Sequence, residues 1–262
     1  MMQMSVTMHP IWQTGGVILA AAIVAALLLQ IVAHRILPIS LRREQTELGA
    51  AIFSVVGVTY AVLLAFIATA AWEQYSAAEA LARHEAALIG NIYRVSHGLP
   101  EPAGTQIRAE LTAYLTHIID VEWPAQIAGE AIPPSEPLLT MLDQAMLRAK
   151  PADIEQSNAQ TFLIGALSDV ATARRDRRLA SHGTIPELVW VVLLSGGALM
   201  VAFSFILGGP TPAMHLLMTA ILVASGVLVL LLIVGLSSPF HGALTIPPDA
   251  YTGVLAEIRA SP

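Results

Sequence analysis

The sequence predicts an all-α integral membrane protein in which two pairs of transmembrane helices flank an extramembrane helical bundle. Composition is the first reason, because 55% of the residues are hydrophobic and only 12% are charged, about half the charged share of an average soluble protein. The second is that the apolar residues gather in four long blocks separated by polar sequence. The third is that no useful period-two alternation occurs in residues 73–186, so we expect no sheet there.

The first pair of spans is predicted within residues 1–72, at about 11–33 and 48–72. Neither block contains a charged residue, and each reaches the roughly 20 apolar residues that a helix needs to cross about 30 Å of hydrocarbon. The first block lacks a basic n-region, and its apolar core is too long for a cleaved signal peptide. We therefore expect it to remain as a span.

The second pair is predicted within residues 187–240, at about 187–207 and 214–236, joined by a short Gly-Pro hairpin. Thr184, Pro186 and Glu187 suit the start of a helix. Since the spans come in pairs, the N-terminus, the central domain and the C-terminus are expected on one side of the membrane. Arginines on the two sides nearly balance, so the positive-inside rule leaves the orientation open.

Residues 73–186 are predicted to form a helical extramembrane domain, because apolar residues recur there at helical spacing. The second span is expected to continue as a helix to Gly98, the next helix to break around Pro124, and a further helix to begin at Pro151. A short amphipathic helix is expected in the tail, residues 241–262. The apolar positions that predict these helices are Leu81, Leu88, Ile92, Val95, Ile107, Leu111, Tyr114, Leu115, Ile118, Leu138, Leu142, Met146, Leu163, Leu167, Val170, Tyr251, Val254, Leu255 and Ile258.

The sequence shows no enzyme motif. No phosphate loop, dinucleotide fingerprint, nucleophile elbow or HExxH pair occurs, and the chain has no cysteine. Its eight histidines are not placed at the spacing of metal ligands. We expect no catalytic residue, no cofactor and no metal. The net charge of -6 gives no reason to expect a nucleic-acid partner.

The polar residues of the second span are the first candidate site. Two interpretations of these residues are open: they line a narrow pore, or they allow helices to pack closely. The residues are Ser54, Gly57, Thr59 and Tyr60. No span carries an ionisable residue in its middle, which counts against a proton-coupled transporter.

Two charged groups are further candidates. The cluster Arg174, Arg175, Arg177 and Arg178 either contacts anionic lipid headgroups or forms an electropositive vestibule that concentrates anions. Trp72 and Glu73, at the end of the second span, are expected to anchor it at the membrane interface.

Several motifs resemble one bacterial family of membrane proteins. They are the run Gly57 to Phe66 with Trp72-Glu73-Gln74-Tyr75, then Tyr93-Arg94, Gly98-Leu99-Pro100, Glu122-Trp123-Pro124, Arg174-Arg175-Arg177 and Ser238-Pro239-Phe240-His241-Gly242. Together they resemble the family labelled bestrophin-like domain. The resemblance implies a layout like that of bestrophins, which are oligomeric anion channels with two transmembrane pairs around a helical cytosolic domain. The acidic calcium clasp and the aromatic neck of bestrophins have no counterpart here.

Two function hypotheses remain. One is a homo-oligomeric ion channel, with an inorganic anion as the transported species; the other is a membrane-anchored helical scaffold or signalling module without transport activity. In both, the protein is a multi-pass protein of the bacterial plasma membrane, and the resemblance favours a cytoplasmic central domain with cytoplasmic N- and C-termini.

Overall fold

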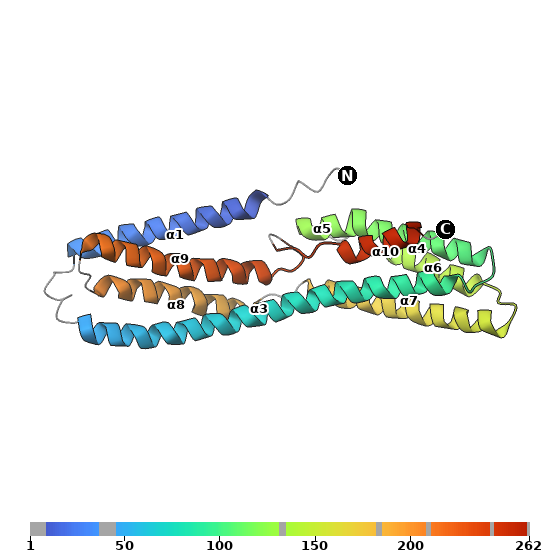
Figure 1. The fold of residues 1–262 in the computed structure, drawn as a ribbon, viewed down its shortest axis with the longest axis horizontal. Helices are drawn as coiled ribbons and strands as arrows, with labels where there is room; N and C mark the ends of the chain where they lie inside the picture. The colour runs from blue at the N-terminus through green and yellow to red at the C-terminus, as the bar shows by residue number, and fades with distance from the viewer. Residues whose placement is uncertain are drawn as a thin grey trace. The chain divides into compact units, whose positions relative to one another are not determined.

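The computed structural model describes residues 9–36, 46–130, 135–181, 185–207, 211–241 and 244–260. Within these ranges every regular element is helical. Four of the described helices are long and apolar enough to cross a membrane: α1 (His9–Ile36), α3 (Thr46–Ser96), α8 (Glu187–Ile206) and α9 (Pro212–Leu236) (Figure 1). The predicted fold class is confirmed. The predicted loop between the first two spans, the centre of the Gly-Pro hairpin and Thr184 lie outside the described residues.

The chain divides into two compact units. We call residues 1–73 and 184–237 the membrane unit, and residues 74–183 and 238–262 the helical unit. Helix α3 contributes to both, through Glu73 to the membrane unit and from Gln74 onward to the helical unit.

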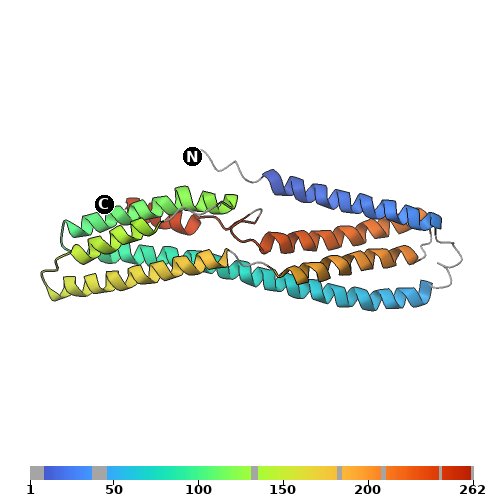
Figure 2. The same ribbon diagram turned by 180° about the vertical axis from the view of Figure 1, so that it is seen from behind.

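In the membrane unit, α3 and α8 pack as an antiparallel pair (Figure 2). The rings of Phe53 and Phe203 stack with their centroids 5.7 Å apart. The Tyr60 hydroxyl donates to the carbonyl oxygen of Leu193 at 2.8 Å. Its ring lies so close to Gly196 that a Cβ there would come within 2.8 Å of it. The contact therefore depends on a residue without a side chain, as is common where membrane helices approach closely.

Among the described residues, the helical unit adds five helical elements between α3 and α8. These are α4 (Ala103–His117), continued by a π-helical turn η1 (Ile118–Glu122) and α5 (Trp123–Ala128), then α6 (Glu136–Arg148) and α7 (Ile154–Ala180). The prediction that a helix breaks around Pro124 is wrong. Pro124 lies in the first turn of α5, where a missing N–H is tolerated, and the helical path ends only at Gly129, which has a φ of 71°.

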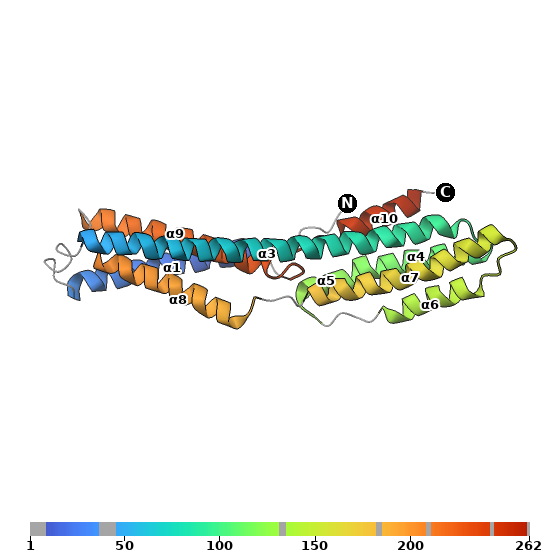
Figure 3. The same cartoon turned by 90° about the horizontal axis from the view of Figure 1, so that it is seen from below.

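The core of the helical unit surrounds Trp123. Its indole N–H donates to the carbonyl oxygen of Ile246 at 3.0 Å, and its ring contacts Phe240 and Tyr251 with centroids 5.7 Å and 5.2 Å away. Helix α10 (Asp249–Ala260) runs alongside the helices of this unit (Figure 3). It buries Tyr251, Leu255 and Ile258 against the core. The tail helix is thus an integral part of the bundle.

We predict that Gly196→Ala destabilises the membrane unit by about 1–3 kcal/mol, the usual effect of overpacking a close contact, because the new methyl group meets the Tyr60 ring. Gly226→Ala on α9 is the matched control, since a Cβ there meets nothing within 4 Å. Thermal unfolding of the two purified variants in detergent, followed by circular dichroism, measures the difference. Equal unfolding midpoints would contradict the tight α3–α8 contact.

Candidate functional site

The structure separates the four candidate residues of the second span. Gly57 and Tyr60 face α8, with Gly57 close to the Met200 methyl group. Ser54 and Thr59 are exposed, and each hydroxyl donates to a backbone carbonyl four residues earlier in α3, at 2.9 Å. The hydroxyl hydrogens of Ser54 and Thr59 are therefore used within α3, and only the oxygen lone pairs remain available on the outer face of the helix. A pore-lining role for these two residues stays a prediction.

The arginine cluster on α7 is also divided. Arg174 and Arg177 are buried, with 4% and 0% of their surfaces exposed, whereas Arg175 and Arg178 lie at the surface. Burial of a guanidinium is costly unless carboxylates and hydrogen-bond acceptors surround it. The helical unit supplies both.

Arg177 is the centre of this buried network. Its Nε donates to Glu85 of α3 at 2.6 Å, one terminal nitrogen donates to Gln126 of α5 at 3.0 Å, and the other lies 3.3 Å from a Glu122 oxygen. The guanidinium also lies 5.2 Å from the centre of the Trp123 ring, a distance at which a cation and an aromatic face attract each other. One side chain thus joins α3, η1 and α5 to α7.

Arg174 extends the network toward the surface. It donates to Glu122 at 2.8 Å and to Glu136 of α6 at 3.0 Å. Glu136 is more than half exposed, and Arg178 lies 3.5 Å from the same Glu136 oxygen. The two arginines of the interior therefore balance two fully buried carboxylates, Glu85 and Glu122.

Two tyrosines complete the surroundings of Glu85. Tyr251 of α10 donates to one carboxylate oxygen at 2.9 Å, and Tyr114 of α4 to the other at 3.3 Å. Glu85 thus accepts from three side chains on three helices. The helical unit is held together at this point by directed bonds from α4, α7 and α10 to α3.

The pKa values of these groups follow their burial and pairing. Burial, together with the negative charge of Glu85, raises the pKa of both Tyr114 and Tyr251 well above the ordinary value, so both hydroxyls remain donors. Burial alone would raise the pKa of Glu122, but the neighbouring Ser135 hydroxyl and the positive charges of Arg174 and Arg177 outweigh it and lower the pKa. The pKa of Arg177 is raised, because Glu85 outweighs the cost of burial. At neutral pH Glu122 and Arg177 are therefore charged and paired, whereas Tyr114 and Tyr251 keep their protons.

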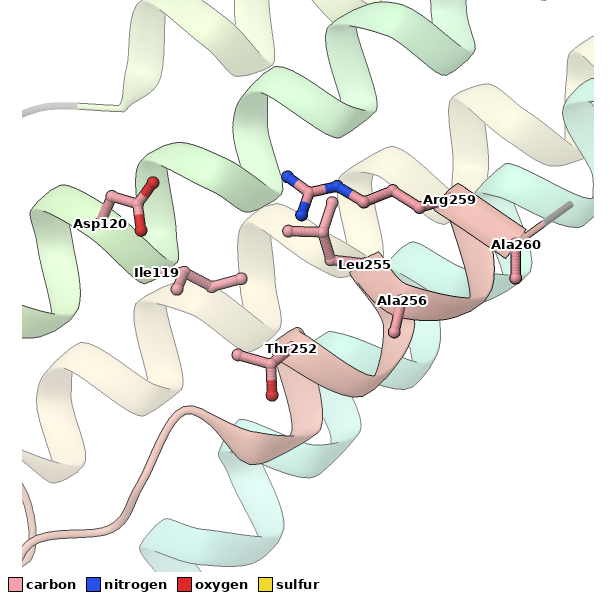
Figure 4. A pocket seen from close by; sticks show the side chains of 7 residues that line it. All are labelled: Ile119, Asp120, Thr252, Leu255, Ala256, Arg259 and Ala260. Carbon is pink, nitrogen blue, oxygen red and sulfur yellow. The ribbon is translucent and has the colours of Figure 1, made fainter. Parts of the chain in front are cut away.

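The paired network has little capacity to react with a ligand. Its carboxylates and guanidiniums are engaged with one another, and the described residues contain no group of three or more metal-binding side chains. A separate groove of about 590 Å³ lies between η1 and α10 (Figure 4). Its lining is mostly apolar, with Asp120 and Arg259 as the charged members, so it offers no converging polar groups for a reaction.

Sequence reasoning singled out Arg174 and Arg177 but missed their partners. Glu85, Glu122, Gln126 and Tyr251 were not identified as members of one cluster. A signal existed for Glu85, which stands among Ala78, Ala82 and Ala86 on the inner face of α3. A charge within a stripe of small residues indicates a buried ion pair, but its partner cannot be found from spacing alone.

We predict that Arg177→Met destabilises the helical unit by about 3–5 kcal/mol, because it leaves Glu85 buried without its charged partner. Arg175→Met removes an exposed charge and should change stability by less than about 0.5 kcal/mol. The double variant Glu85→Gln/Arg177→Met should recover part of the loss. Denaturant unfolding of the detergent-solubilised protein, followed by tryptophan fluorescence, tests the series; equal effects of the two single substitutions would contradict it.

We also predict a loss of stability in acid. Because folding lowers the pKa of Glu122 from 4.5, the stability from its charged form is complete above pH 4.5 and is lost as the pH falls through the lowered value. Unfolding midpoints measured from pH 6 down to about pH 3 should fall, and Glu122→Gln should flatten part of that dependence. Glu130→Gln, at an exposed position, is the control and should leave the slope unchanged.

Comparison with known proteins agrees with the fold. Two single-residue variants of a bacterial bestrophin homologue from Klebsiella pneumoniae have similar structures. The first has a TM-score of 0.71 at 17% identity, with 92% of this chain and 99% of that chain covered. The second has a TM-score of 0.67 at 18% identity, with 93% and 99% covered. At these identities the likeness shows the fold.

A comparison with curated proteins gives no match. The model of the Bestrophin-like domain family matches residues 20–251, which include α3, the helical unit through Tyr251, and both helices of the second pair. The chain therefore belongs to the Bestrophin-like domain family.

Proposed function

We propose that the protein is a homo-oligomeric ion channel that conducts inorganic anions, with the exposed face of α3 bordering the ion path. Membership of the Bestrophin-like domain family supports this proposal, as does the similarity of fold to a bacterial bestrophin homologue. The spans are residues 11–33, 48–72, 187–207 and 214–236, and residues 73–186 form the extramembrane domain.

The observation that carries the proposal is the outer face of α3 in the membrane unit. Side chains on this face are small or uncharged and are exposed within one chain: Ser54, Val58, Ala61, Ala65 and Thr69. The Thr69 hydroxyl, like those of Ser54 and Thr59, donates to its own helix. A face of this kind suits a close approach of copies around an axis, and selectivity would come from width and hydroxyl lining.

Charges outside the spans fit the same proposal. Arg175 and Arg178 are the two clustered arginines at the surface, so we assign to them the contact with anionic headgroups or the electropositive vestibule. Trp72 is 59% exposed and Glu73 is exposed, as an interfacial anchor requires.

Membership of the same family also supports a proposal for the location. We assign the protein to the bacterial plasma membrane, with the extramembrane domain and both termini in the cytoplasm. The chain has no natural cysteine, so labelling of Thr211→Cys and Glu130→Cys with an impermeant reagent reports the side directly. Labelling of Glu130→Cys from outside intact cells would reverse this assignment.

We predict that liposomes containing the full-length protein release chloride faster than potassium, and that Ser54→Leu lowers the chloride flux at least about tenfold by narrowing an uncharged path. Ser195→Leu is the matched control, because Ser195 is also an exposed hydroxyl bonded to its own helix, on α8. Arg175→Gln/Arg178→Gln should weaken the preference for chloride while the buried arginines stay intact.

Size-exclusion chromatography in detergent checks that the variants keep the oligomeric state of the unmodified protein. An absence of flux for every anion and cation tested, under varied voltage and pH, would overturn the channel proposal and favour the membrane-anchored scaffold. Equal flux through Ser54→Leu and the unmodified protein would instead remove the α3 face from the ion path.

A further inference from the structure

A buried polar seam joins α1 to α9 inside the membrane unit. His34 Nε2 lies 3.0 Å from His215 Nδ1, and His215 Nε2 lies 3.0 Å from the carbonyl oxygen of Ser204 in α8. Because a carbonyl only accepts, His215 donates through Nε2 to Ser204. The end of α1 and the start of α9 lie together at this point (Figure 1), so the two helices are antiparallel.

The helical register places two more polar residues one turn deeper. Gln30 precedes His34 by four residues, and Thr219 follows His215 by four; positions four apart share a helix face. Gln30 is 0% exposed and Thr219 is 1% exposed. They occupy the facing turns of α1 and α9 next to the histidine pair.

Neither side chain has a partner among the described residues. Both amide atoms of Gln30 and the hydroxyl of Thr219 are buried and without a hydrogen bond. Six serine and threonine hydroxyls in the spans behave differently, since each donates to a carbonyl of its own helix: Ser54, Thr59, Thr69, Ser195, Ser204 and Ser225. The Thr219 hydroxyl lacks such a bond to its own helix.

One turn deeper still, the seam becomes apolar. Ala26 on α1 and Val223 on α9 are 6% and 7% exposed, and they occupy the next positions in the same register. Polar groups thus extend from the helix ends through two turns and then stop. Ala26 and Val223 therefore close the seam at its inner end.

We propose that this seam is a water-binding site within the membrane unit, in which bound water hydrogen-bonds Gln30 and Thr219 behind the His34–His215 pair. An amide that offers a donor and an acceptor, facing a hydroxyl that offers both, matches the hydrogen-bonding capacity of water. In an apolar surround, polar groups of this kind remain only where such partners complete them. The inference is independent of channel activity.

The absence of natural cysteines allows a background-free test. Thr219→Cys places one thiol in the seam, and no hydrogen bond to another described residue is lost. Infrared spectroscopy of the purified protein in lipid nanodiscs follows the S–H stretch after transfer to deuterium oxide. Val223→Cys is the dry control one turn deeper, and Thr161→Cys, at an exposed position on α7, is the wet control.

The Thr219→Cys thiol is expected to show a hydrogen-bonded S–H frequency and to exchange within about tenfold of the Thr161→Cys rate, while the Val223→Cys thiol exchanges at least about a hundredfold more slowly. Exchange of Thr219→Cys as slow as that of Val223→Cys would overturn the proposal. Fast exchange of both the Thr219→Cys and the Val223→Cys thiols would contradict a seam that is closed at its inner end.

A second measurement uses the unmodified chain, so that the proposal does not depend on the folding of a variant. In protein labelled with ¹⁵N-glutamine, the side-chain amide signal of Gln30, identified by its loss in Gln30→Met, is expected to show magnetisation transfer from water. A Gln30 signal without transfer, beside transfer at exposed glutamines, would contradict bound water in the seam.

Discussion

The helical unit depends on one buried charge, the guanidinium of Arg177. Its full burial would be strongly unfavourable in an apolar bundle, and it is tolerated because Glu85, Glu122 and Gln126 converge on it from α3, η1 and α5. These partners lie 51 to 92 residues away in the chain. The geometry of the bundle is therefore specified by a small number of directed bonds as well as by apolar packing.

The membrane unit relies on a different kind of constraint. Here the Tyr60 ring of α3 lies against Gly196 of α8, where the lack of a side chain leaves room for the ring. Apolar side chains cannot distinguish a helix from the surrounding lipid, so close packing and a few hydrogen bonds must fix which helices pair. The hydroxyl of Tyr60 supplies one such bond to the Leu193 carbonyl.

Residue patterns predicted the fold well because each helix has a local signal. Long blocks of uncharged residues predicted the spans, and apolar residues at helical spacing predicted α4, α6, α7 and α10. The break expected around Pro124 failed because the π-helical turn η1, after which the Trp123 amide bonds the Ile118 carbonyl, carries the helical path into α5 just before the proline. Local sequence does not show whether a proline ends one helix or begins the next.

The site was only partly predictable, for a related reason. Arg174 and Arg177 stand out as a cluster, but which arginines face inward depends on the rotation of α7, and their partners lie on other helices. Of the positions expected on the inner face of α3, Ile92 lies in the core, and Leu88 and Val95 pack against it. That face also runs through Ala82, Glu85 and Ile89, which the expected stripe did not include. Small residues on that face made its apolar signal weak.

The position of α10 has a consequence for biosynthesis. The indole of Trp123 and the carboxylate of Glu85 take their bonds from Ile246 and Tyr251, which leave the ribosome after α8 and α9. The central segment therefore cannot reach its final packing during translation, and must wait, incompletely closed, until both helices of the second pair have been synthesised and the last residues emerge. Premature termination before Ile246 would leave all four apolar helices but a bundle without the bonds to Trp123 and Glu85.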